Sequence, residues 1–308
     1  MKTEQQALRT SLVAILVLSA LGIGFGVVSG SSAIIFDGVF SLMDAVMSVV
    51  SIVVAGLIAR STANELSQRV QRRFTMGFWH FEPVVLAVNA LLMMSVATYA
   101  LIQSILSILS GGREIEFGPA VAYAGIVLVL TSTVGLPEHR ANRRIDSALV
   151  AVDVKGWLMA GGVTAALLIA FLIGLIIQGT HLDWLLPYVD PVVLALVAAV
   201  LIPVPFGTLR KAVAELALIT PDEVMESAER LAAATVEDEG FSTYRVSAAK
   251  TGRATQIDVV FLVPEGLPPR QLEDWDRIRA ELGASLGHDD PNNWITISFT
   301  TRPYAFSE

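Results

Sequence analysis

The chain has 308 residues, of which 54% are hydrophobic and 16% are charged, and its formal net charge is -8 at pH 7. This excess of apolar residues excludes an ordinary soluble protein for most of the chain. The sequence contains no cysteine, which excludes disulfides and thiolate metal ligands, so any bound metal must be held by oxygen or imidazole.

Six apolar runs have the length that a helix needs to cross a bilayer. They cover residues 12–28, 33–59, 83–109, 120–136, 148–177 and 191–206. Gly22, Gly26 and Gly30 form a ladder of small residues in the first run, which permits close approach of a neighbouring helix. Pro203 and Pro205 are expected to end the sixth. We therefore predict an α-helical membrane domain of six transmembrane helices over residues 1–209.

Basic residues predict the orientation of these spans. They lie before the first span and after the second, fourth and sixth: Lys2, Arg9, Arg60, Arg69, Arg72, Arg73, Arg140, Arg143, Arg144, Arg210 and Lys211. Arg113 alone lies in a connector on the other side. Because cytoplasmic loops carry an excess of Lys and Arg, both termini are expected in the cytoplasm and the chain in the cell membrane.

Polar side chains recur on one face of the second predicted span. Asp37, Ser41, Asp44, Ser48 and Ser51 are four, three, four and three residues apart, which is the spacing of one helix stripe. A charge at bilayer depth costs about 2.5 to 3.5 kcal/mol, so such residues usually face a cavity, a partner or an ion path. A stripe of oxygens can replace the water around a cation. Alternatively, the serines pack helices closely and the aspartates cap or pair internally.

Two other spans carry weaker signals. Asp153, Trp157, Ala160 and Thr164 in the fifth span repeat the spacing of the stripe on the second, with one carboxylate fewer. Glu82, at the start of the third span, is either a group of an inner vestibule or the partner of a loop arginine.

Residues 210–308 are charged, acidic and typical of a soluble domain. Thr220-Pro221-Asp222-Glu223 predicts a capping box and a helix to about residue 235. Strands are predicted over residues 244–249, 256–263 and 294–300, and a second helix over 268–286. This α-β-β-α-β order predicts a small α+β domain of the open-faced sandwich type. His288, Asp289 and Asp290 are interpreted as a solvated turn. No nucleotide-binding loop or catalytic triad occurs, so we expect no enzyme activity, no cofactor and no nucleic-acid partner.

Four of these features together resemble the cation diffusion facilitator family. They are DGVFSLMD at residues 37–44, GFWHFEP at residues 77–83, the run from residue 153 to 164, and the C-terminal domain. The resemblance covers essentially the whole chain. It implies a membrane transporter that exchanges a divalent metal cation for protons, exports the metal from the cytoplasm and forms a homodimer through its cytoplasmic domain.

The chain also departs from that family at its transport site. The family pairs two ligands from the second span with two from the fifth, each pair four residues apart. Phe40, Gly156 and Ala160 stand at three of these positions, and Asp44 stands at the fourth. The usual tetrahedral zinc site therefore cannot form from these four residues.

The remaining oxygen ligands define our site prediction. We predict Asp44, Asp37 and Asp153 as metal ligands, with Ser41, Ser48 and Glu82 as further candidates. Such a set suits Mn²⁺, Fe²⁺ or Mg²⁺, and Zn²⁺ and Co²⁺ stay open. The alternative is a family member that has lost transport and serves as a membrane scaffold, sensor or regulatory subunit.

Overall fold

The computed structural model describes residues 4–63, 65, 67–75, 77–145, 148–252, 254–290 and 292–303, without the side chains of residues 4–9, 62, 144–145, 148–153 and 155. The chain divides into two compact units, which are described separately. The first comprises Met1–Val50 and Val88–Gly207, and the second comprises Ser51–Ala87 and Thr208–Glu308.

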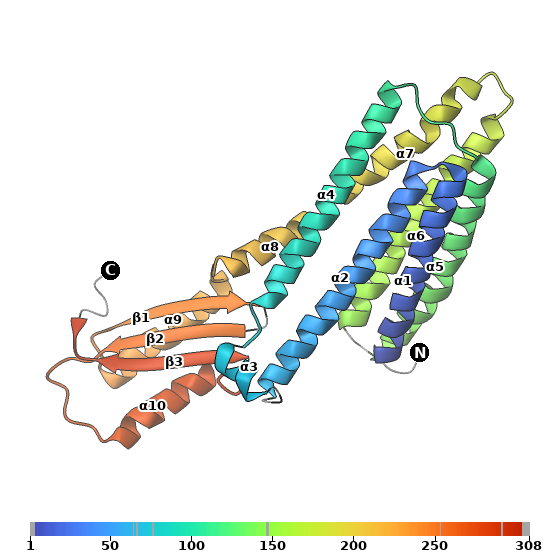
Figure 1. Cartoon of the computed structure of the whole chain (residues 1–308). Helices are drawn as coiled ribbons and strands as arrows, with labels where there is room; N and C mark the ends of the chain where they lie inside the picture. The colour runs from blue at the N-terminus through green and yellow to red at the C-terminus, as the bar shows by residue number, and fades with distance from the viewer. Residues whose placement is uncertain are drawn as a thin grey trace. The chain divides into compact units, whose positions relative to one another are not determined.

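Within the described residues, six helical segments are long and apolar enough to cross a membrane. Their helices are α1 (Glu4–Ser29), α2 (Ser32–Thr62), α4 (Phe81–Leu109), α5 (Phe117–Ile145), α6 (Ala148–Ile177) and α7 (Leu186–Leu201) (Figure 1). All six predicted spans are thus confirmed. Helix α7 ends two residues before Pro203, as predicted, and α8 (Phe206–Leu216) follows. The short helices α3 (Gln68–Arg73) and η1 (Asp183–Leu185) lie in connectors.

Helices α1 and α2 pack backbone against backbone. A Cβ atom added to Gly22 would lie 2.6 Å from the Cα of Gly38, and one added to Gly26 would lie 2.7 Å from the backbone nitrogen of Ile35. Small residues permit this approach. Gly30 instead occupies the turn between the two helices with a φ of 72°, so the predicted glycine ladder holds at two steps and is wrong at the third.

The start of α2 is capped by a side chain from α7. Asp190, which is fully buried, accepts hydrogen bonds from the Ser31 hydroxyl, from the Ser32 N–H at 2.9 Å and from the Ala33 N–H at 3.2 Å. Arg113 donates to the Ser32 hydroxyl. A carboxylate at a helix N-terminus satisfies N–H groups that have no partner within the helix and favours the helix dipole. The helix that carries the predicted site is therefore fixed at its first turn.

The C-terminal part of the second unit has the predicted α-β-β-α-β order. Its elements are α9 (Asp222–Glu239), β1 (Thr243–Thr251), β2 (Ala254–Leu262), α10 (Leu272–Ser285) and β3 (Asn293–Thr300) (Figure 1). Strand β2 pairs antiparallel with β1 and parallel with β3. Ala232 of α9 and Ile278 of α10 belong to one core with the alternating Ile257, Val259 and Phe261 of β2. Both helices therefore cover the same face of the sheet.

The predicted helix starts in this domain need two corrections. Helix α9 has Pro221 as its N-cap and no side-chain capping bond, because the Thr220 hydroxyl donates instead to the Ala248 carbonyl of β1. The capping box predicted there is wrong. Helix α10 begins after Gln271, which forms a capping box with Asp274, rather than at residue 268. The preceding Arg270 is held outside the helix by an ion pair with Glu239 at 2.5 Å.

Candidate functional site

A cavity of about 260 Å³ in the first unit contains the carboxylates of the second span. Asp37, Ser41 and Asp44 line it from α2, as the stripe on this helix predicts. Ser48, one turn further along, is half-buried but is not among the residues that line it. The other lining side chains come mainly from α1, α2, α4, α6 and the segment after α7, and most are apolar. The cavity is thus an apolar chamber with a few oxygen atoms on one wall.

The four positions at which the resemblance implies a transport site all line this cavity. Phe40 and Asp44 line it from α2, and Gly156 and Ala160 line it from α6. Among these four, only Asp44 has a side chain that can ligate a metal. A Cβ atom added to Gly156 would meet nothing within 4 Å, so the space at this position is open rather than filled by another group.

Tyr123 of α5 holds Asp37 and was missed by the sequence analysis. Its hydroxyl donates to Asp37 Oδ2 at 2.7 Å, and its ring, only 1% exposed, lies 5.9 Å from that of Phe25. A buried tyrosine hydroxyl in a membrane span needs an acceptor, and that requirement is the one signal that the sequence offered. Asp37 is consequently joined to a second helix.

The two remaining predicted site residues, Asp153 and Glu82, are not among the residues that line this cavity. Asp153 belongs to the start of α6, but its side chain is outside the described part of the structure. Glu82 lies in the first turn of α4, within the second unit, where a Cβ atom added to Gly252 would be 3.0 Å from its Oε2. Among the described residues, no three His, Asp or Glu side chains form a group that could hold a metal ion.

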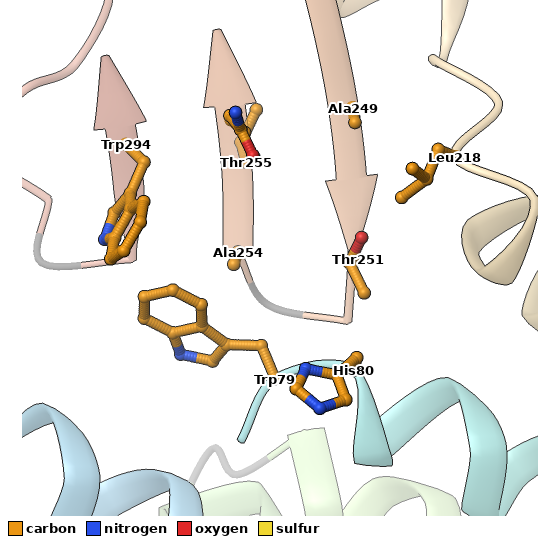
Figure 2. Close-up of a pocket in the computed structure, with 9 residues that line it drawn as sticks. Trp79, His80, Leu218, Ala249, Thr251, Ala254, Thr255 and Trp294 are labelled. Atoms are coloured by element: carbon orange, nitrogen blue, oxygen red, sulfur yellow. The ribbon is translucent and has the colours of Figure 1, made fainter. Parts of the chain in front are cut away.

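A second cavity, of about 220 Å³, lies in the second unit beside the sheet (Figure 2). Trp79 and His80, which precede α4, line it together with Trp294 of β3. The two indole rings meet edge to face, with centroids 5.7 Å apart. The turn between β1 and β2 is fixed nearby, because the Gly252 N–H donates to Glu215 of α8 at 2.9 Å. Among its lining residues, this cavity has one histidine and no carboxylate, so we assign it no metal-binding role.

The model of the cation efflux transmembrane domain matches residues 8–217 of this chain. The chain belongs to the cation diffusion facilitator family. The match extends over all six candidate spans. No curated protein gives a significant match to the chain. This facilitator is therefore a multi-pass membrane protein that transports cations, and the family is not enzymatic.

The cavity of this facilitator has a few oxygen atoms but, among the described residues, no cluster of three metal ligands. Carboxylates within a membrane span usually face a cavity, a partner or an ion path. Asp37 and Asp44 supply carboxylate oxygens, and Ser41 adds a neutral one. These are the oxygen atoms that a cation in this cavity would meet.

Proposed function

We propose that this chain is a divalent metal cation/proton antiporter of the cell membrane that exports metal from the cytoplasm. The observation that supports this function is the cavity lined by Asp37, Ser41 and Asp44 within a domain of cation efflux type. Asp44 and Asp37 are the principal ligands, and Asp153 is the third. Ser41 or water completes the coordination, whereas Ser48 and Glu82, which do not line the cavity, stay predictions of the sequence.

The coupling to protons follows from the ligand chemistry. A carboxylate binds metal only when it is deprotonated, so metal binding releases protons and acidification weakens metal binding. Alternating access would expose the cavity first to one side of the membrane and then to the other, by rocking the helices that bear the site against the remaining spans. Oxygen ligands favour Mn²⁺, Fe²⁺ or Mg²⁺ over softer ions.

The orientation and assembly belong to the same proposal. The basic connectors support cytoplasmic N- and C-termini. We assign transport to residues 1–209 and dimerisation to residues 210–308, with the homodimer formed through the cytoplasmic domain.

The contribution of Asp44 to metal transport can be tested in proteoliposomes that enclose a metal-sensitive dye. Zn²⁺, Mn²⁺, Fe²⁺, Co²⁺ and Mg²⁺ are compared under a proton gradient. Asp44→Asn is expected to reduce the flux of the transported ion by at least about tenfold, because the cavity loses its main ligand. Asp289→Asn, which changes an exposed carboxylate of the cytoplasmic domain, is the matched control and is expected to keep the wild-type flux.

A second candidate function is a membrane scaffold, sensor or regulatory subunit without transport. Its support is the lack of ligand atoms at Phe40, Gly156 and Ala160. A scaffold tolerates simultaneous replacement of Asp37, Asp44 and Asp153 by asparagine, whereas a transporter does not. Absence of flux for every ion, in wild-type protein that is folded and dimeric, would favour the scaffold.

A further inference from the structure

We propose that the cavity around Asp44 also binds a small hydrophobic organic ammonium ion. This proposal rests on the proposed function only in that both place a cation beside Asp44. Few metal-ligating atoms line this cavity. Asp37, Ser41 and Asp44 are the described lining residues that carry a side-chain oxygen, whereas a metal ion of the oxygen-seeking kind takes about six ligands.

The walls of the cavity supply what an ammonium ion needs besides a carboxylate. Three aromatic residues, Phe36, Phe40 and Trp157, are among those that line it. The rings of Phe36 and Phe40 lie 5.6 Å apart, and the indole of Trp157 is fixed by a 2.9 Å hydrogen bond from its Nε1 to the hydroxyl of Ser11. Aromatic rings bind alkylated ammonium groups through cation–π attraction.

The size and polarity of the cavity agree with this ligand class. Small-molecule sites are mostly apolar chambers with a few polar groups that fix the ligand, usually of roughly 300 to 1,000 Å³. At about 260 Å³, this cavity is just below that range and suits a small ligand. Gly156 leaves open space, and Met93 and Met159 add adaptable apolar surface.

Three of the family's ligand positions in this cavity are occupied by Phe40, Gly156 and Ala160. Phe40 brings an aromatic residue to one ligand position, and Gly156 leaves open space at another. None of the three offers a metal-ligating side chain, and Phe40 offers a ring to an organic cation. The carboxylate of Asp44, kept at the fourth position, supplies the charge that both kinds of cation need.

The binding test uses benzyltrimethylammonium as the probe and isothermal titration calorimetry on the purified full chain in detergent. Benzyl alcohol, which has the ring without the charge, measures the contribution of the charge. Asp44→Asn is expected to weaken probe binding by at least about thirtyfold. Phe40→Leu, which keeps an apolar side chain but loses the ring, is expected to weaken it roughly three- to tenfold.

Two control variants change residues that do not line the cavity. Asp289→Asn removes an exposed carboxylate and Trp184→Leu removes an exposed aromatic ring, so both are expected to bind the probe like wild type. Size-exclusion chromatography identifies any variant that has not folded. If Asp44→Asn fails to fold, Phe40→Leu and competition between the probe and Mn²⁺ for the wild-type protein provide the test.

Metal flux, measured on the same preparations, separates this proposal from the proposed function. Probe binding that depends on Asp44 and Phe40 supports the ammonium site, whether or not any metal is transported. Metal flux that depends on Asp44 without probe binding overturns the ammonium site and leaves the proposed function standing. Probe binding that is equal in wild type and in both cavity variants also overturns it.

Discussion

At the scale of single residues, the cavity depends on how its carboxylates are held. Asp37 is joined to α5 by the hydrogen bond from Tyr123, and this bond crosses from one membrane span to another. Asp44 and Ser41 follow on the same helix stripe. Asp37 therefore links α2, which forms part of the cavity wall, to α5. The contribution of this link to stability can be tested by changing Tyr123.

Replacing Tyr123 by phenylalanine removes only the hydroxyl that donates to Asp37. A buried acceptor that loses its donor costs about 1 to 3 kcal/mol, so Tyr123→Phe is expected to lower the thermal stability of the protein in detergent. Thermal unfolding followed by tryptophan fluorescence measures this loss. Tyr99→Phe is the matched control, because Tyr99 is 64% exposed. Equal melting temperatures for the two variants would contradict a structural role for the hydrogen bond.

At the scale of secondary-structure elements, α2 is fixed in two ways. Asp190 caps its first turn from α7, and the backbone of α1 contacts it at Gly38. Both contacts are at the end of α2 that precedes Asp44. The position of the cavity wall is thus set by neighbouring helices rather than by α2 alone.

A methyl group at Gly22 is expected to push α1 and α2 apart. The added Cβ would lie 2.6 Å from the Cα of Gly38, too close for either backbone to remain in place. Overpacking of this kind costs about 1 to 3 kcal/mol, so Gly22→Ala is expected to lower thermal stability and cation flux together. Gly24→Ala is the control on the same helix, because its Cβ would meet nothing within 4 Å. A wild-type melting temperature for Gly22→Ala would rule out this helix contact.

At the scale of the whole molecule, the second unit joins segments that are distant in the sequence. The turn between β1 and β2 contacts the residues that begin α4 and the side chain of Glu215 in α8. Gly252 occupies this turn with a φ of 59°, and its Cβ position lies 2.8 Å from the carbonyl oxygen of Trp79. The C-terminal sheet is thereby tied to the start of a membrane span.

Substitution of Gly252 tests whether this contact holds the turn in place. Gly252→Ala introduces a clash with the Trp79 carbonyl and a strained backbone, at a cost of about 1 to 3 kcal/mol. We expect the turn to detach from the start of α4, which limited proteolysis at the turn would detect as faster cleavage. Gly266→Ala, where an added Cβ meets nothing within 4 Å, is expected to behave like wild type. Identical cleavage of both variants would show that the contact does not hold the turn.

The sequence by itself determined the six spans, the α-β-β-α-β order and the oxygen stripe over Asp37, Ser41 and Asp44. These features are local, since the length of an apolar run and the period of a helix are encoded in neighbouring residues. Helix starts near Thr220 and residue 268 were wrong because side chains there bond to other elements, at Ala248 and Glu239.

Only the tertiary structure decided which groups surround the carboxylates. Tyr123 meets Asp37 across 86 residues of sequence, and Ser31 meets Asp190 across 159. The open space at Gly156, which lines the cavity together with Phe40, likewise depends on the packing of α6 against its neighbours. A helical period gives the face on which a side chain lies, but not the helix that this face meets. The packing of the whole helix bundle determines which helices meet.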